Sequence, residues 1–235
     1  MRRWIFAALA AMAFTAPAAA QDEEEIVVTG SRLAAYEGFP VPHVFITRRA
    51  DFAVVEVEIR NDTRAADARL GEIIEALQRL ESGATRAGMT LALVDDDIGI
   101  VRPYSQAAAE QLMAPGGRAD TTYLTVRVRS PVERNDTLES IHDRIERFVT
   151  GTPKPGRVET TVGDTDLSIV NLEQYRDGML RQILAEGRTL SELVGGAQAI
   201  SIGGLESQVG FHRTGDLDLV LFLPYELAVS LPSQP

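Results

Sequence analysis

Two stretches of this chain combine a strand pattern with a helix pattern, and they restrict the fold more than any other feature. Phe52 to Arg60 and Thr121 to Arg129 alternate apolar residues with polar or charged ones, which is typical of a β-strand with one buried face. Each stretch is followed by an Asn-Asp-Thr triplet, at residues 61–63 and 135–137, and then by apolar residues at helical spacing. The order favours an α+β fold.

Three amphipathic segments predict helices. The first is expected to run for about six turns and to end at Gly88. Its apolar stripe is Leu70, Ile73, Ile74, Leu77 and Leu80. The second stripe is Leu138, Ile141, Ile145 and Phe148, with Asp136 and Glu139 as an expected capping box. The third helix is expected over Glu173–Val194, with Tyr175, Met179, Ile183, Leu190 and Leu193 in the core.

Short apolar runs between turn residues predict the other strands. They cover residues 44–48, 89–94, 98–101, 158–162, 167–170, 199–202 and 216–223. Residues 163–166 read as a hairpin turn, and 106–120 as irregular or weakly helical. The expected fold is a mixed or antiparallel sheet packed with two long helices and one shorter helix. The repeated triplet leaves two interpretations open: two related strand–helix units, or good N-cap chemistry used twice.

The first 20 residues predict an export signal. Arg2 and Arg3 are followed by the apolar run Trp4–Phe14 and by the small residues Ala18–Ala20, as a signal peptidase requires. Residues 21–42 then form an acidic segment and a Pro-containing linker, and 43–230 form the expected folded domain. We therefore expect the mature protein in the periplasm, with no transmembrane segment.

Charge and cysteine content exclude several function classes. The formal net charge is −11, which argues against nucleic acid as a partner. The chain has no Cys, so disulfides, thiol nucleophiles and thiolate metal sites are excluded, and packing alone must stabilise the exported protein.

The order of elements resembles the SIMPL domain family (DUF541) of bacterial periplasmic proteins. Three features carry the resemblance: Val101-Arg-Pro-Tyr104, the strand that begins at Tyr123, and a last helix before Gly195-Gly-Ala-Gln-Ala-Ile-Ser-Ile202. It covers about residues 44–227. The last helix departs from the family pattern, because it is rich in Arg and Leu. The resemblance implies an α+β fold, an envelope location, self-association and no established catalysis.

The peptide Glu25-Ile-Val-Val-Thr-Gly-Ser-Arg32 carries a second resemblance, to the TonB box of outer-membrane receptors. Its β-prone residues suit addition as a strand to a partner's sheet edge. The predicted contact residues for a protein partner, with TonB as the candidate, are Ile26, Val27, Val28, Thr29 and Gly30. The alternative is that this segment pairs with the protein's own sheet.

Catalytic and metal motifs are weak. His43, His142 and His212 are not at ligand spacing, and Asp95–Asp97 lacks the spacing and the Gly of a calcium loop. Gly151–Gly156 lacks the Gly-Lys-Ser/Thr ending of a phosphate loop. Residues 201–207 contain Gly and Ser, but not in the order that a nucleophile elbow requires. We therefore expect no cofactor, no metal and no enzymatic activity.

Three functional hypotheses follow. The first is a non-enzymatic protein acting by protein–protein contact or self-assembly, in envelope maintenance or TonB-linked uptake. The second is a small-molecule or ion binder, with a pocket between sheet and helices lined by Arg102, Tyr104 and Arg127. The third is a hydrolase whose site forms only in three dimensions.

Overall fold

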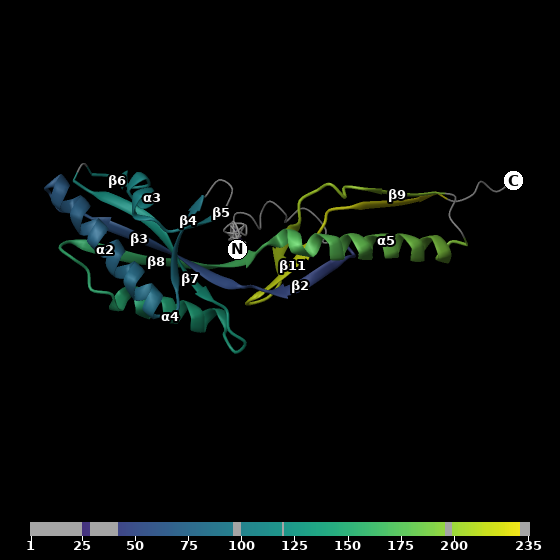
Figure 1. Cartoon of the computed structure of the whole chain (residues 1–235), viewed down its shortest axis with the longest axis horizontal. Coiled ribbons are helices and arrows are strands. Elements are labelled where there is room, and N and C mark those ends of the chain that lie inside the picture. The colour runs from purple at the N-terminus through teal and green to yellow at the C-terminus, as the bar shows by residue number, and fades with distance from the viewer. Residues whose placement is uncertain (1–24, 29–41, 96–99, 119, 196–198, 231–235) are drawn as a thin grey trace, which may run out of the picture.

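The computed structural model describes residues 25–28, 42–95, 100–118, 120–195 and 199–230. The molecule is elongated (Figure 1): a sheet covered by two helices lies at one end, and a long helix beside a two-stranded ribbon lies at the other. Every strand pairing in these residues is antiparallel. The predicted α+β class, with two long helices and one shorter helix, is confirmed.

The larger sheet forms a closed circuit. Its strands are β1 (Glu25–Val28), β3 (Phe52–Asn61), β4 (Thr90–Asp95), β5 (Ile100–Pro103), β6 (Ala114–Pro115), β7 (Thr122–Pro131) and β8 (Val158–Val170). Pairings run from β3 to β8, β1, β5, β4 and β7 and return to β3, while β6 adds to β7. The weakest link is β1, which pairs with β8 over four residues but with β5 only at Ile26 and Ile100.

The central pair, β3 and β7, follows the predicted alternation. The two strands pair along their whole length, from Phe52 opposite Pro131 to Asn61 opposite Thr122. Their buried face is made by Val55, Val57, Ile59, Leu124, Val126 and Val128. On the opposite face, the alternation predicts an outward-facing Arg127, but this side chain is buried beside Glu56.

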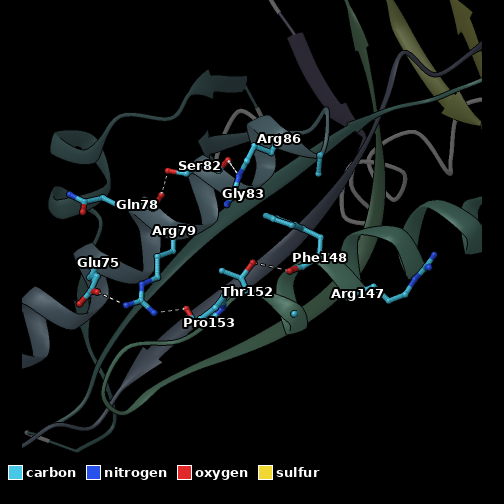
Figure 2. A pocket seen from close by; sticks show the side chains of 12 residues that line it. Glu75, Gln78, Arg79, Ser82, Gly83, Arg86, Arg147, Phe148, Thr152 and Pro153 are labelled. Atoms are coloured by element: carbon cyan, nitrogen blue, oxygen red, sulfur yellow. Dashed lines mark hydrogen bonds and ion pairs between the residues drawn. The ribbon is translucent and has the colours of Figure 1, made fainter.

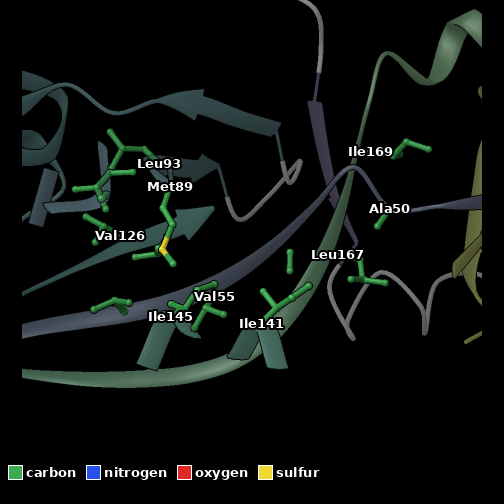
Figure 3. Packing of buried hydrophobic residues seen from close by; sticks show 14 of the residues in the cluster. Ala50, Val55, Met89, Leu93, Val126, Ile141, Ile145, Leu167 and Ile169 are labelled. Atoms are coloured by element: carbon green, nitrogen blue, oxygen red, sulfur yellow. The ribbon is translucent and has the colours of Figure 1, made fainter. Parts of the chain in front are cut away.

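Two helices cover the apolar face of β3 and β7. They are α2 (Ala66–Arg86) and α4 (Leu138–Gly151), and the short helix α3 (Gln106–Gln111) lies next to α2. Figure 3 shows Ile141 and Ile145 of α4 beside Val55, with Met89 and Val126 close by. All of these side chains are at most 3% exposed, so this layer is the core that holds the sheet and helices together.

The first helix matches the predicted length but not the whole predicted stripe. Ile73, Leu77 and Leu80 are buried, and Ala76 and Ala84 complete the buried face. Leu70 is 44% exposed, so its prediction as a core residue is wrong. It lies between Arg69 and Glu72, whose side chains make polar contacts to β7 and to the end of β3, so this turn faces a polar environment.

The capping box of α4 is shifted by one residue from its predicted place. Thr137 is the N-cap, and its hydroxyl accepts a hydrogen bond from the Ser140 amide at 3.1 Å. The Ser140 hydroxyl accepts from the Thr137 amide at 3.0 Å, so the Asp136–Glu139 pairing is wrong. Asp136 instead binds the Arg144 guanidinium and the Glu133 amide.

The predicted hairpin at 158–170 is wrong, because these residues form the single strand β8. β3 stays paired with β8 throughout, with Val55 opposite Thr165 and Val57 opposite Val162. The extra residues of β8 form a bulge at Gly163, where a Cβ atom would lie 3.3 Å from the Glu56 Cβ. The turn-like residues therefore mark a bulge and not a chain reversal.

The other end of the molecule holds the remaining elements. They are β2 (Phe45–Arg49), the 3-10 helix η1 (Leu172–Tyr175), α5 (Arg176–Leu193), β9 (Ala199–Gly203), β10 (Gly210–Arg213), β11 (Asp218–Phe222) and β12 (Glu226–Ser230). β10, β11 and β2 form a three-stranded sheet, and β9 pairs with β12 as a ribbon. The sequence patterns do not predict β10 or β12.

Candidate functional site

A projecting arm, formed by α5, β9 and β12, is the first candidate (Figure 1). Met179, Ile183 and Gly187 form the buried face of α5. A Cβ atom at Gly187 would lie 3.5 Å from Ile202 and from Leu227, so this glycine lies where the ribbon meets the helix.

The base of the arm is held by polar contacts. The Tyr225 hydroxyl donates to Glu186 Oε2 at 2.6 Å, and Arg176 donates to the carbonyls of Leu205 and Ser207. Burial, and then the bond to Glu186, raise the pKa of Tyr225 to about 12. These bonds join α5 to the segments that flank the ribbon.

The end of the arm is apolar and exposed. Leu193 is 76% exposed, Val194 43% and Ile200 36%, and we call these three residues the apolar tip. Leu193 was predicted as a core residue and is not, because it lies in the last turn of α5, beyond the buried positions. Leu193 and Val194 are neighbours at the end of α5, whereas Ile200 lies on β9 with its Cγ2 atom 3.7 Å from the place of a Cβ atom at Gly187. Large apolar side chains exposed on one arm indicate a contact surface.

The TonB-box-like peptide lies inside the protein's own sheet where the structure describes it. Ile26 pairs with Ile169 of β8 and with Ile100 of β5, and Val27 pairs with Ser168. Thr29 and Gly30 lie outside the described residues. The second of the two interpretations from sequence, pairing with the chain's own sheet, therefore describes the backbone of residues 25–28.

The three predicted pocket residues are not brought together. Arg102 lies exposed on β5 opposite Leu93, whereas Arg127 lies buried on β7 opposite Ala92, so the two side chains belong to opposite faces of the sheet. Tyr104 follows β5 and packs partly buried against the core. Burial, and then Glu81 and Glu110, raise its pKa to about 12.

Arg127 takes part in a charged cluster on the sheet face away from α2 and α4. It forms an ion pair with Glu56, and Asp166 of β8 lies near both groups. Burial raises the pKa of Asp166 from 3.8 to about 6; Arg127 opposes this rise, while Asp164 and Glu56 add to it.

The first prediction concerns this carboxyl group. Between about pH 4 and 6 the folded protein binds a proton that the unfolded chain has lost, so stability falls as the pH rises through this window. Asp166→Asn removes the charge and should stabilise the protein at pH 8 by about 1 kcal/mol, a value reduced for the water that still reaches this group. Below pH 4 the two proteins should be equal.

Urea unfolding at pH 8 and pH 3.5 measures this difference. Asp143→Asn, at an exposed position of α4, is the control and should change stability little at either pH. A gain for Asp166→Asn that is the same at both pH values would contradict the assignment.

The histidines lie apart. His142 Nδ1 is 2.9 Å from the Thr165 hydroxyl, and both line an open depression of about 520 Å³. His43 lies 3.8 Å from Glu186, and His212 is on β10. Within the described residues no group of three or more His, Cys, Asp or Glu side chains is arranged to hold a metal ion.

Sequence reasoning missed one groove, between α2 and α4, with a volume of about 910 Å³ (Figure 2). Its lining includes Arg79, Arg86, Arg147 and Phe148. The two helices are separated by many residues, so spacing along the chain gives no signal for it. The only local sign is that each Arg lies on the polar side of its amphipathic helix.

No protein-family model, no curated protein and no solved structure matches this chain. The SIMPL resemblance therefore stays a prediction. Among the described helices, none is both long enough and apolar enough to cross a bilayer.

Proposed function

We propose that this is an exported, non-catalytic protein of the periplasm that works by protein–protein contact, and that a second copy of the chain binds at the arm. The observation that carries the proposal is the apolar tip together with strand β9, to which Ile200 of the tip belongs. Export is supported by residues 1–20 of the sequence, TonB-linked uptake by the TonB-box-like peptide 25–32, and a role in envelope maintenance by the SIMPL resemblance.

The edge of β9 is open to a further strand. In the described part of the chain β9 has only β12 as a partner, so its other edge carries unpaired backbone groups. Edge strands are usually protected by charges, proline or bulges. The β9 sequence Ala199-Ile-Ser-Ile-Gly203 has none of these, so the edge is suited to strand pairing.

Charge favours a second copy as the occupant. Two copies of a chain with a net charge of −11 repel each other, so they need a contact surface without acidic groups. β9 and the apolar tip together contain no charged residue. Antiparallel pairing of β9 with its own copy would give a two-fold interface in which both chains use the same residues.

The second prediction tests this interface with Ile200→Lys. A lysine at this position of β9 would bring a charge into the interface from each copy, and both charges would have to be desolvated. We expect wild-type mature protein to sediment as a dimer or larger at tens of micromolar, and the variant to dissociate at least about tenfold more readily. Sedimentation equilibrium measures both.

The control is Leu112→Lys, at another large apolar residue, which is 53% exposed and lies after α3, away from the arm. It should associate as wild type does. Thermal unfolding of both variants shows whether the fold is kept. A monomeric wild-type protein, or an Ile200→Lys variant that associates with unchanged affinity, would overturn the proposal.

A further inference from the structure

An open depression lies over β3 and β7 next to β6, at the end of the molecule opposite the arm (Figure 1). Its volume is about 250 Å³, which is below the range of drug-sized sites, so a ligand that binds here must be small. Six residues line it: Glu58, Arg60, Gly116, Gly117, Thr121 and Tyr123. None of them is among the ligand-binding residues that the sequence predicts.

The strand register places the charged and aromatic side chains of this depression on one face of the sheet. Arg60 of β3 lies directly opposite Tyr123 of β7, so the two side chains are neighbours on the same face. Glu58 lies two residues before Arg60 and therefore points to the same side of β3. This is the face away from α2 and α4, because Ile59 and Leu124 alternate with these residues and belong to the buried face that the helices cover.

The two charged groups of the depression are not used by the fold. Among the described residues, Glu58 and Arg60 have no hydrogen bond and no ion pair, either with each other or with Glu159, which lies opposite Arg60 on β8. The side-chain bonds of Asp62 go to Arg157, and the charge of Arg60 acts on Asp62 only from a distance. In this part of the structure a carboxylate and a guanidinium are therefore both available to a ligand.

A buried hydroxyl in the same lining lacks a partner. Thr121 is 3% exposed, and its Oγ1 atom has no hydrogen-bond partner among the described residues. Buried polar atoms are nearly always hydrogen-bonded, so an exception marks a place where a bound molecule or water completes the bonding. Gly116 permits this packing, because a Cβ atom there would lie 2.8 Å from the Thr121 Cγ2 atom. At Gly117 a Cβ atom would meet no atom within 4 Å, so the depression is open on this side.

One acidic and one basic residue leave the depression without net charge. A ligand with only an acidic group would face Glu58 as well as Arg60, and a ligand with only a basic group would face the same mismatch with Arg60. A small zwitterion satisfies both residues, because its ammonium group can donate to Glu58 and its carboxylate can accept from Arg60. The ring of Tyr123, which is 38% exposed, offers an apolar surface for the rest of the ligand.

We propose that this depression binds a free α-amino acid, with Glu58 recognising the ammonium group, Arg60 the carboxylate and Tyr123 an apolar side chain. The site is separate from the arm, and it does not rest on the proposed self-association. Because Arg60 and Tyr123 are exposed, water partly screens these interactions, and we expect a dissociation constant of about 1 mM.

The test is an NMR chemical-shift titration of the full mature chain with L-phenylalanine. N-acetyl-L-phenylalanine lacks the ammonium group and L-phenylalaninamide lacks the carboxylate, so each should bind about tenfold more weakly. Glu58→Gln should weaken L-phenylalanine about tenfold but should not weaken the N-acetyl compound, which has no ammonium group to lose. Arg60→Gln should likewise weaken L-phenylalanine but not the amide.

The matched controls are Glu146→Gln and Arg134→Gln, which remove the same charges at exposed positions of α4 and of the loop before it. Each should change the affinity less than about twofold. Circular dichroism and thermal unfolding establish that every variant is folded. The proposal is overturned if L-phenylalanine does not bind at about 10 mM, or if its shift changes avoid the amides of Gly116 and Gly117. Equal binding of the three compounds would also overturn it, because the charges would then not be recognised.

Discussion

Deletion of residues 21–32 should lower the free energy of unfolding of the mature protein by about 3 kcal/mol. The deletion removes β1, which pairs with β8 over four residues and connects it to β5. Several main-chain hydrogen bonds of about 1 kcal/mol each are lost. Leu167 and Ile169, which are fully buried, also lose the strand opposite them.

Urea unfolding followed by circular dichroism measures this loss. The matched control is deletion of residues 21–24, which removes the acidic residues before β1 but keeps the strand, and it should change stability by less than about 0.5 kcal/mol. Val27→Pro places a proline in a strand with neighbours on both sides and should destabilise as the longer deletion does. Equal stability of the two deletion proteins would show that β1 does not hold the sheet.

This pairing bears on the proposed TonB contact. A partner that takes residues 25–28 as an added strand must first separate them from β8 and β5. A cost of about 3 kcal/mol weakens such binding about a hundredfold compared with a free peptide of the same sequence. The sequence alone could not show this, because a β-prone segment suits its own sheet and a partner's sheet equally well.

The sequence predicts those parts of the fold in which a residue pattern is compatible with only one local structure. The alternation in β3 and β7 and the stripes in α2 and α4 report a single buried face, which the structure confirms for most of these residues, with Leu70 as an exception. Gly163–Asp166 has two explanations, a turn or a bulge, and only the continuous partner β3 decides between them. Arg127 was misplaced because alternation reports which face a residue is on but not whether that face is covered.

The site was harder to predict than the fold, for a related reason. Leu193 fits the helical stripe of α5 but extends beyond the buried part of that helix. The lining of the α2–α4 groove comes from two helices that are far apart in the chain, which approach each other at Gly83. Such sites depend on tertiary contacts that no local pattern encodes.

The two Asn-Asp-Thr triplets show most directly how one local sequence takes two roles. In the second triplet Thr137 caps α4, as the N-cap interpretation predicts. In the first, α2 begins only after Ala65, which makes no side-chain cap. There, Asn61 and Thr63 instead donate to Glu72 Oε2 at 2.7 and 2.8 Å.

Glu72 connects these residues to the loop before β8. The Arg157 amide donates to the same Oε2 atom at 3.1 Å. This bond, and then those from Asn61 and Thr63, hold the pKa of Glu72 below its usual 4.5. Gly156 has a φ of +53°, and a Cβ atom there would collide with the Glu72 carboxylate, so glycine is required at this position.

Asn61→Ala should therefore destabilise the protein by about 3 kcal/mol. Asn61 is fully buried, donates to Glu72 and to the Arg69 carbonyl, and accepts from the Thr63 amide at 2.8 Å. Truncation leaves the Thr63 amide without its acceptor and opens a small cavity. Urea unfolding at pH 7 is the measurement.

Asn135→Ala is the matched control, because Asn135 is the same residue in the second triplet and is exposed. It should change stability by less than about 0.5 kcal/mol. Asn61→Asp keeps the shape of the side chain but places a carboxylate against Glu72, so it should destabilise the protein at pH 7. The stability of this variant should recover partly as the pH falls, because the carboxyl groups are then protonated. If Asn61→Ala and Asn135→Ala cost the same, the two triplets have one structural role, and the distinction drawn from the Glu72 contacts is wrong.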